Sequence, residues 1–209
     1  MTFVKEFQDF LNGNQTIKTH AQQLEIAGEN VRDLSIRLFW KGLGETTVKP
    51  ASPSDLAALT EFLTLGLGEN SRFLFAPYPY DERLSNALEA VLGDCGEGKL
   101  LMYHAWHGER IVGHFFLGGF DKPIPELGIA VADDFHGRRL GHLFMVILMA
   151  AARVCGKEAI ELTTNPSNKA GFHLYQKLGF EHVRDKEITL GDGTHRIEHV
   201  MIYKVSSHS

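Results

Sequence analysis

One stretch of this 209-residue chain constrains its fold more than any other. The segment Ile124–His142 reads IPELGIAVADDFHGRRLGH. It predicts a short apolar strand over Glu126–Val131, a turn, and a loop with glycine and arginine that opens a long apolar helix over 141–155. The first turn of a helix has unpaired backbone N–H groups and carries roughly half a positive charge. The segment is therefore typical of a site that binds phosphate groups.

The composition is that of an ordinary globular protein with a mild excess of acidic residues. Apolar residues make up 44% and charged residues 22%, and the formal net charge is −5 at pH 7. Proteins that hold nucleic acid through its phosphates usually carry a basic stripe, so we expect no nucleic-acid partner. The longest apolar run, Leu143–Ala152, is too short for the roughly 20 residues of a membrane helix, so we expect no membrane association.

The cysteines and histidines indicate neither a disulfide framework nor a metal site. The chain has two cysteines, Cys95 and Cys155, and its first residues lack the apolar core of a secretory signal, so we expect a cytoplasmic protein. The eleven histidines are scattered. His104 and His107 lie three apart on a predicted strand, where they face opposite sides, so we expect no metal ion.

The periodicity along the chain predicts helices and strands around a mixed sheet, which is an α/β arrangement. We expect an N-terminal extension over 1–45, a main domain over 46–205 and a tail over 206–209. The extension contains a predicted helix over 3–13, a weaker helix within 14–32 and a strand over 34–40. The main domain is predicted to contain, in order, a strand at 46–49, helices at 53–66 and 81–93, strands at 99–106, 110–117 and 126–131, a helix at 141–155, a strand at 159–164, a helix at 168–178 and a hairpin of 187–190 and 196–205.

A second motif lies downstream, in the segment NKAGFHLYQKLGF of residues 168–180. Asn168 and Tyr175 are seven residues apart, two turns of one helix, so both side chains can face the same cleft. The two motifs and the order of elements resemble those of the GNAT superfamily, the acetyl-CoA-dependent N-acetyltransferases. The family patterns are Gln/Arg-x-x-Gly-x-Gly/Ala for the loop and Asn-x-x-Ala-x-x-x-Tyr-x-x-x-Gly-Phe for the helix. The resemblance covers roughly 46–205.

The loop departs from the family pattern at two positions. It reads HGRRLG over 136–141, so that Gly141 agrees, His136 replaces the usual Gln or Arg, and Arg139 replaces the first glycine. Backbone amides bind phosphate whatever side chain they carry, and Arg138 and Arg139 can add charge-assisted hydrogen bonds. We therefore expect the amides near 137–142 to bind the pyrophosphate of coenzyme A. The alternative interpretation is a solvated basic turn that caps a helix.

The resemblance implies an α/β (α+β) fold with a mixed, mostly antiparallel, splayed sheet flanked by helices, here with an N-terminal helical and strand extension. It also implies acetyl-CoA as co-substrate, with no metal. In the family, the asparagine bonds the pantetheine arm or structures the strand–helix turn. The residues expected to bind the cofactor are Ile129, Ala130, Val131, His136, Gly137, Arg138, Arg139, Leu140, Gly141, His142, Asn168, Ala170 and Tyr175.

Two residues are predicted to be catalytic. An amine must lose a proton before it attacks a thioester, and Glu126, at the start of the strand before the loop, is our candidate base. Tyr175 is the candidate general acid toward the leaving thiolate, and a backbone N–H within Gly128–Val131 is the expected donor to the oxyanion. The alternatives are a solvent-exposed glutamate at a strand end and a core tyrosine.

These expectations predict an N-acetyltransferase that transfers an acetyl group from acetyl-CoA to a primary amine of a small molecule, peptide or protein by direct attack. The acceptor is expected to meet the aromatic loop 66–80 and the final hairpin. One alternative is a non-catalytic acyl-CoA-binding sensor or interaction module of the same fold. Another assigns the N-terminal helices to protein interaction, and a homodimer is possible.

Overall fold

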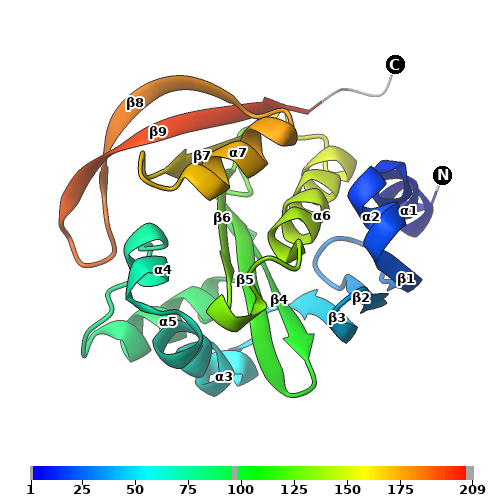
Figure 1. The fold of residues 1–209 in the computed structure, drawn as a ribbon, viewed down its shortest axis with the longest axis horizontal. Coiled ribbons are helices and arrows are strands. Elements are labelled where there is room, and N and C mark those ends of the chain that lie inside the picture. The colour runs from blue at the N-terminus through cyan, green and yellow to red at the C-terminus, as the bar shows by residue number, and fades with distance from the viewer. Residues whose placement is uncertain (1, 96–97, 206–209) are drawn as a thin grey trace.

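The computed structural model describes residues 2–95 and 98–205, so the predicted tail over 206–209 lies outside the described residues. Its centre is one nine-stranded sheet in the order β1-β2-β3-β4-β5-β6-β7-β9-β8 (Figure 1). Neighbouring strands are antiparallel except β6 and β7, which are parallel. The strands are β1 Ala21–Ala27, β2 Ser35–Trp40, β3 Gly44–Pro50, β4 Leu100–His107, β5 Arg110–Gly118, β6 Glu126–Val131, β7 Ala159–Thr164, β8 Glu181–Thr189 and β9 His195–Lys204.

Helices cover both faces of this sheet, with α6 on one face and α3 and α5 on the other (Figure 1). The α-helices are α1 Phe3–Gly13, α2 Gln15–His20, α3 Leu56–Glu61, α4 Glu69–Leu74, α5 Leu84–Asp94, α6 Leu140–Val154 and α7 Lys169–Lys177. Shorter helical turns are η1 Pro53–Asp55, η2 Phe62–Gly66 and η3 Asp133–Phe135. The mixed, mostly antiparallel sheet flanked by helices confirms the predicted fold class. No helix of the described residues is both long and apolar enough to span a membrane.

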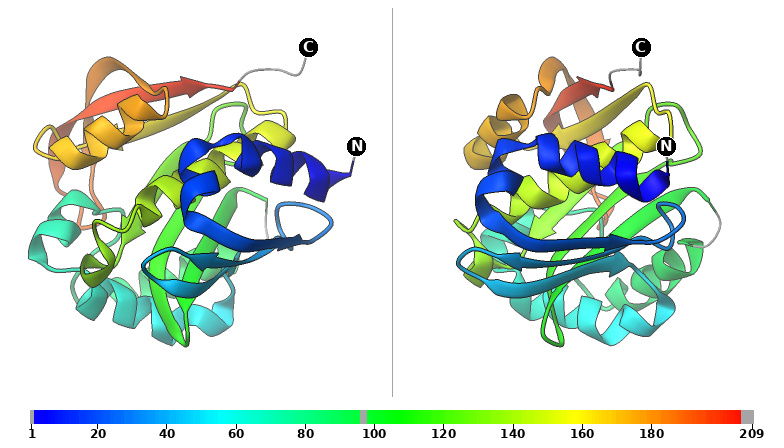
Figure 2. Two further views of the ribbon diagram at one scale, coloured as in Figure 1. Left: turned by 45° about the vertical axis from the view of Figure 1, so that its right-hand side comes forward. Right: turned by 90° about the vertical axis from the view of Figure 1, so that its right-hand side faces the viewer.

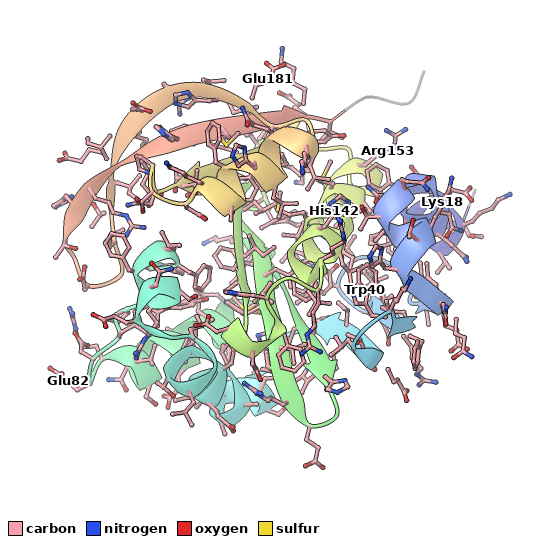
Figure 3. The ribbon with its side chains drawn as sticks, viewed as in Figure 1. Lys18, Trp40, Glu82, His142, Arg153 and Glu181 are labelled. Atoms are coloured by element: carbon pink, nitrogen blue, oxygen red, sulfur yellow. The ribbon has the colours of Figure 1, made fainter. Side chains whose placement is uncertain are left out.

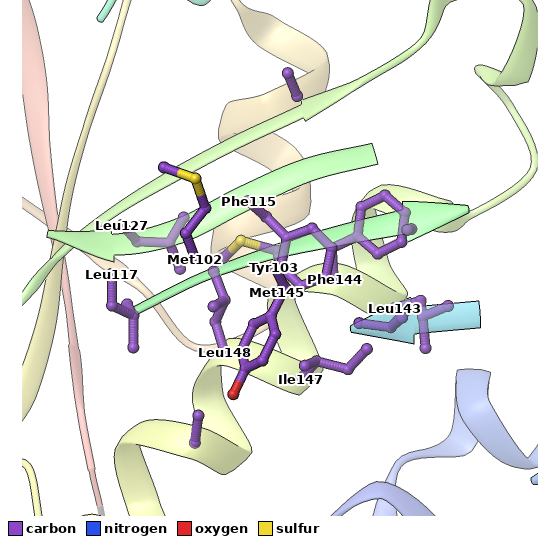
Figure 4. Close-up of a cluster of buried hydrophobic side chains, with 14 of the residues drawn as sticks. Met102, Tyr103, Phe115, Leu117, Leu127, Leu143, Phe144, Met145, Ile147 and Leu148 are labelled. Atoms are coloured by element: carbon purple, nitrogen blue, oxygen red, sulfur yellow. The ribbon is translucent and has the colours of Figure 1, made fainter. Parts of the chain in front are cut away.

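Helix α6 forms the centre of the core. It is apolar on every side, which is typical of a helix enclosed by other elements. One side packs on β5 and β6, where Phe144 stacks on Phe115 with ring centroids 4.5 Å apart (Figure 4). The other side contacts α1, so the N-terminal helices lie beside α6 (Figure 2). Because both sides of α6 are covered, its apolar residues can surround the helix on every side.

The N-terminal extension joins the same sheet and the same core. Strand β2 pairs with β3 from Ile36 to Trp40, and β1 pairs with β2 at the outer edge. Phe7 and Leu11 of α1 and Trp40 of β2 are completely buried in one cluster with α6. The extension therefore contributes buried surface to the main domain.

Three sequence predictions need correction. The weaker helix predicted within 14–32 ends at His20 and is followed by β1, an edge strand whose exposed residues obscure the strand pattern. The loop predicted over 66–80 contains the short helix α4. Strand β8 begins at Glu181, six residues before the predicted 187. The prediction missed these residues because the strand is exposed almost throughout, so its sequence shows no alternation of apolar and polar residues.

A buried chain of hydrogen bonds crosses the sheet from η1 to the loop before α5. Nδ1 of His104 lies 3.0 Å from the Asp55 carboxylate, and its Nε2 lies 3.2 Å from Nδ1 of His114. Nε2 of His114 lies 3.0 Å from the Tyr78 hydroxyl. Burial lowers the pKa of both imidazoles, so each is neutral and the chain runs in one direction, from the tyrosine O–H to the carboxylate. The partner of His104 is thus His114 on the adjacent strand and not His107.

We expect Gly113→Ala in β5 to lower the free energy of unfolding by about 1–3 kcal/mol through overpacking. A Cβ at this position would lie 2.1 Å from the Phe144 ring, which is buried and stacked and cannot move away. Chemical denaturation gives the stability. The matched control is Gly93→Ala in α5, where a Cβ meets no atom within 4 Å. Equal stabilities of the two variants would contradict the packing argument.

Candidate functional site

The candidate site is a pair of connected cavities where β6 and β7 separate. The two strands share a single register pair, Glu126 with Glu161, and diverge beyond it. A smaller cavity of about 190 Å³ lies between β6 and α7, and a larger one of about 880 Å³ is bounded by the β8–β9 hairpin and the segment after α4. Both cavities are lined by Leu74, Phe75, Leu127, Gly128 and Thr163, so they meet at these residues.

Divergence leaves one edge of β6 without a partner strand. The Glu161 N–H donates to Pro125 O on the β7 side, and the Ala132 N–H donates to Val112 O on the β5 side. Because amides alternate along a strand, the N–H groups of Ile129 and Val131 point toward β7, where the ladder has ended. The lining of the smaller cavity includes both residues, together with Ala130. This edge can therefore bind an extended ligand in the manner of an added strand.

The loop after β6 places a second set of unpaired amides at the start of α6. Leu140, Gly141 and His142 form the first helical turn, and the first helical bond runs from the Leu143 N–H to Arg139 O at 3.2 Å. Amides of a first turn have no partners within the helix, and they face an anion favourably. The Leu140 side chain is buried in the core, so only its backbone can contribute.

Arg139 occupies a backbone conformation that favours glycine. Its φ is +60° and its ψ is 18°, in the left-handed region, at the position where the family loop has its first glycine. Gly137 also has a positive φ, of +75°. An arginine in this region costs roughly 1–2 kcal/mol relative to ordinary helical backbone. The exposed Arg139 guanidinium has no hydrogen-bond or ion-pair partner among the described residues, so it is available to an anion at the helix start.

Arg138 does not take the role that we predicted for its side chain. Its guanidinium donates to Gly42 O at 3.0 Å and to Asp134 O at 3.3 Å, and its carbonyl accepts the Trp40 indole N–H at 2.8 Å. These bonds tie the loop to the β2–β3 turn. The guanidinium therefore supports the loop from behind and does not extend toward a ligand.

His142 is also directed away from the cavities. Its Nε2 lies 3.0 Å from Asn14 Oδ1, between α6 and the N-terminal helices (Figure 3). Only the His142 backbone belongs to the first turn of α6. His136, in contrast, lines the smaller cavity, and its Nε2 donates to Val131 O at 3.0 Å. It closes the end of β6.

Asn168 shapes the turn between β7 and α7. Its Oδ1 accepts the Gly171 N–H at 3.0 Å as the N-cap of α7, and its Nδ2 donates to Thr164 at 3.2 Å. Asn168 lines the smaller cavity, whereas Ala170 is exposed on α7 and does not. The small residue of the family pattern is instead Gly171, where a Cβ would lie 2.4 Å from the Asn168 amide.

Tyr175 lies at the wall of the smaller cavity. It is 8% exposed and packs against Phe180, and its hydroxyl has no hydrogen-bond partner among the described residues. Burial, aided by the negative charge of Glu198, raises the pKa of Tyr175 to about 12. The hydroxyl therefore keeps its proton at neutral pH and can donate a hydrogen bond to an atom in the cavity.

Glu126 lies on the larger cavity. Its side chain is exposed to that cavity, yet the surrounding walls desolvate the carboxylate, and this effect, with the neighbouring Glu161, raises its pKa. Glu161 is paired with Arg184 at 3.0 Å, and Glu198 is paired with Arg196 at 2.5 Å. Among the described residues, neither Glu126 nor Glu187, the other acid that lines this cavity, has an ion-pair partner. Glu126 precedes Leu127 and Gly128, where the two cavities meet, so it is the unpaired carboxylate best placed to accept a proton there.

The aromatic loop contributes one ring to the cavities. Phe75 lines both of them. Tyr78 is buried in the chain that ends at Asp55, and Tyr80 donates its hydroxyl to Phe75 O at 2.6 Å. Phe73 is exposed, with the Arg196 guanidinium over its ring. Most of the loop thus supports the wall of the larger cavity.

Sequence reasoning missed several residues that shape the site. The tip of the β8–β9 hairpin closes the larger cavity, because the Gly191 N–H donates to Ala76 O, and a Cβ there would lie 2.2 Å from the Tyr78 backbone. Gly128 is similarly held against the Phe116 ring. Gly128 lies within the apolar strand of the first motif. A glycine inside a strand often marks a close approach of another group, so the sequence alone could have indicated this contact.

Comparisons with known proteins agree with this geometry. A family described as Acetyltransferase (GNAT) family matches residues 67–180. No curated protein matches the chain in sequence. Among solved structures, the GNAT domain of S. lividans PAT aligns with a TM-score of 0.67 at 15% identity, covering 81% of this chain and 96% of that chain.

Two further solved structures share the fold. A structure of yncA from Salmonella typhimurium with its cofactor acetyl-CoA has a TM-score of 0.62 at 20% identity, covering 78% of this chain and 96% of that one. The ribosomal-protein-S18-alanine N-acetyltransferase from Escherichia coli has a TM-score of 0.60 at 18% identity, with the same two coverages. Identities this low show a common fold.

We expect Arg139→Gly to leave the protein as stable or to stabilise it by up to about 1 kcal/mol. Relief of left-handed backbone, roughly 1–2 kcal/mol, exceeds the added entropy of the unfolded chain, about 0.4–1 kcal/mol. Urea denaturation measures the difference. The control is Arg138→Gly, which removes the bonds to Gly42 and Asp134 and should destabilise. If Arg139→Gly destabilises as much as the control does, Arg139 has a structural role that its geometry does not show.

Proposed function

The chain belongs to the GNAT acetyltransferase family, whose members use acetyl-CoA, and from that premise we propose that it transfers the acetyl group to a primary amine of a small molecule or peptide by direct attack. The observation that carries this proposal is the unpaired edge of β6 beside the open first turn of α6. Together they offer two neighbouring sets of backbone donors. The β6 edge lines the smaller cavity, which meets the larger cavity that contains Glu126.

The donors present fit the two polar parts of coenzyme A. We assign the pyrophosphate to the amides of Leu140, Gly141 and His142, where helix start and anion attract each other, with the exposed Arg139 guanidinium beside them. We assign the pantetheine arm to the free edge of β6 at Val131, whose amide is left without a partner strand. Bound acetyl-CoA would supply a thioester at the junction of the two cavities.

Glu126 acts as the base. An amine with a pKa near 10 arrives protonated, and the Glu126 carboxylate accepts one proton, which frees the nitrogen lone pair to attack the carbonyl carbon. The raised pKa of Glu126 makes it a stronger base than an ordinary carboxylate, and a general base is most effective when its pKa lies near the working pH. We assign the Ile129 N–H as donor to the developing oxyanion, because it is an unpaired amide that follows the shared lining residues.

Tyr175 stabilises the leaving sulfur. When the carbon–sulfur bond breaks, the sulfur takes the electron pair, and the second amine proton ends on it. The Tyr175 pKa of about 12 lies above the value of about 8.5 for a thiol, so complete proton transfer from the tyrosine to the thiolate would be uphill. Its contribution is therefore a hydrogen bond to the thiolate, which is weaker catalysis than full general-acid action.

The non-catalytic alternative rests on one observation, the strained Arg139 at a glycine position of the loop. A sensor would keep the cofactor site and lack turnover. The deciding experiment incubates the protein with acetyl-CoA and a panel of primary amines and follows the release of free thiol, alongside calorimetry with acetyl-CoA. Turnover on any amine supports the proposed function. Binding without turnover on the whole panel favours the sensor, and absence of binding at millimolar acetyl-CoA refutes both.

We expect Tyr175→Phe to lower kcat by about 10–100-fold, at or below the low end of general-acid effects, because a thiolate is a fair leaving group. Only the hydroxyl is removed, so affinity for acetyl-CoA should stay within about twofold. Stopped-time thiol release and calorimetry give the two quantities. If affinity is lost while kcat is kept, the hydroxyl positions the cofactor and does not assist the leaving group.

We expect Glu126→Gln to lower kcat/KM at pH 7 by about 10²-fold, the lower range for a general base. In the wild-type protein activity should fall as the pH drops through the raised pKa of Glu126, since the base works only when deprotonated. The variant should lack that acid limb. The control is Glu82→Gln, because Glu82 is exposed and lines neither cavity. An unchanged acid limb with full activity in Glu126→Gln would exclude this residue as the base.

A further inference from the structure

A β-bulge in β8 brings three potential metal ligands to one face of the β8–β9 hairpin. His182 and Asp185 lie three residues apart, which in a regular strand would place them on opposite faces. The register shifts between His182 and Arg184, so one additional residue lies on the β8 side. His182 is opposite Met201 and Asp185 is opposite His199, and these two partners are two apart on β9. His182, Asp185 and His199 therefore share a face.

The side-chain atoms of this cluster, which we call the His–Asp–His triad, converge on one point. A single oxygen, Asp185 Oδ1, lies 2.9 Å from His182 Nε2 and 2.7 Å from His199 Nδ1. All the potential ligand atoms lie within 4.8 Å of one another.

The triad lies on the opposite face of the hairpin from the larger cavity. Along β9, Arg196 and Glu198 line that cavity, and His199, the next residue, points to the other side. There Phe172 of α7 contacts both imidazoles edge to face, with ring centroids 6.3 Å from His182 and 5.6 Å from His199. Phe172 orients the rings, while the side chains remain 26–53% exposed and open to an ion.

We propose that His182, Asp185 and His199 bind a divalent transition metal ion of the zinc class. Two imidazoles and one carboxylate are a common protein ligand set for zinc, which completes its four ligands with water. Calcium and magnesium prefer oxygen ligands, so the two nitrogens select against them. On binding, the ion replaces the two hydrogens that now point at Asp185, and each neutral imidazole carries its proton on the other ring nitrogen.

An ion here would link two strands where their own pairing is interrupted. Strand β8 is the edge strand of the sheet and is paired on one side, to β9. The bulge breaks that ladder at the triad. The same hairpin carries Lys186 and Glu198 into the larger cavity. A metal ion bound on the opposite face of the hairpin would therefore stabilise the wall of that cavity. This effect does not depend on the proposed reaction.

The test titrates ZnCl₂ into the full chain after EDTA treatment and dialysis, by calorimetry and by thermal unfolding. We expect one equivalent to bind and the Tm to rise by about 5–10 °C when free Zn²⁺ is about 100 times the Kd. Co²⁺ as a second probe should give the visible absorption of a four-coordinate site. The variants His182→Gln, Asp185→Asn and His199→Gln should each bind Zn²⁺ at least about 10-fold more weakly.

The matched control is His195→Gln, which removes an imidazole from the same strand outside the triad, where it contacts Thr189. It should bind Zn²⁺ like the wild-type protein. Thermal unfolding without metal shows whether each variant is folded, and the three separate substitutions allow for the failure of any one. Absence of stoichiometric binding to the wild-type protein would overturn the proposal. So would wild-type affinity in all three triad variants, since the ion would then lie elsewhere.

Discussion

The site depends on one departure from regular strand pairing. Strands β6 and β7 run parallel and share only the pair Glu126–Glu161 before they separate. Backbone groups that a sheet normally satisfies internally are thereby left for a ligand, and the gap becomes the smaller cavity. The separation is held open from both sides. Gly128 lies against Phe116 on β5, and Asn168 fixes the turn from β7 into α7. Under the proposed function an acetyl donor would be held largely by main-chain atoms, which place little demand on the side chains of the loop.

Electrostatics divides the carboxylates around the larger cavity into two groups. Glu161 and Glu198 are each neutralised by an arginine, Arg184 and Arg196. Glu126 has no such partner in the described chain, and the cavity walls raise its pKa. A carboxylate in this condition exchanges protons more readily near neutral pH than a paired one does. The ion pairs therefore have a chemical consequence. They occupy two of the four glutamates that line the cavity, and Glu126 is left unpaired beside the junction of the two cavities, as is Glu187 on β8.

Sequence patterns predicted the strongly amphipathic or apolar elements and missed those whose order comes from tertiary pairing. The predicted strands 126–131 and 159–164 agree with β6 and β7. Strand β6 is apolar after its first residue, and in β7 the buried Ile160 and Leu162 alternate with Glu161 and Thr163. Strand β8 is exposed almost throughout, so the sequence pattern did not predict its first six residues. The motif residues Asn168 and Tyr175 do share a cavity. The direction of the Arg138 and His142 side chains was not predictable, because it is set by Gly42 and Asn14, which lie 96 and 128 residues earlier in the chain.

That last feature has a consequence for how the protein can be divided. The family match spans residues 67–180, yet the loop that opens α6 is anchored by Trp40, Gly42 and Asn14, all outside it. Trimming the chain to the matched residues would remove two hydrogen-bond partners of Arg138: the Trp40 indole N–H, which donates to its carbonyl, and Gly42 O, which accepts from its guanidinium. The N-terminal segment therefore holds the loop over 136–141 and the first turn of α6 in place through these contacts. Grafting this loop into another scaffold would therefore also require the N-terminal residues that contact it.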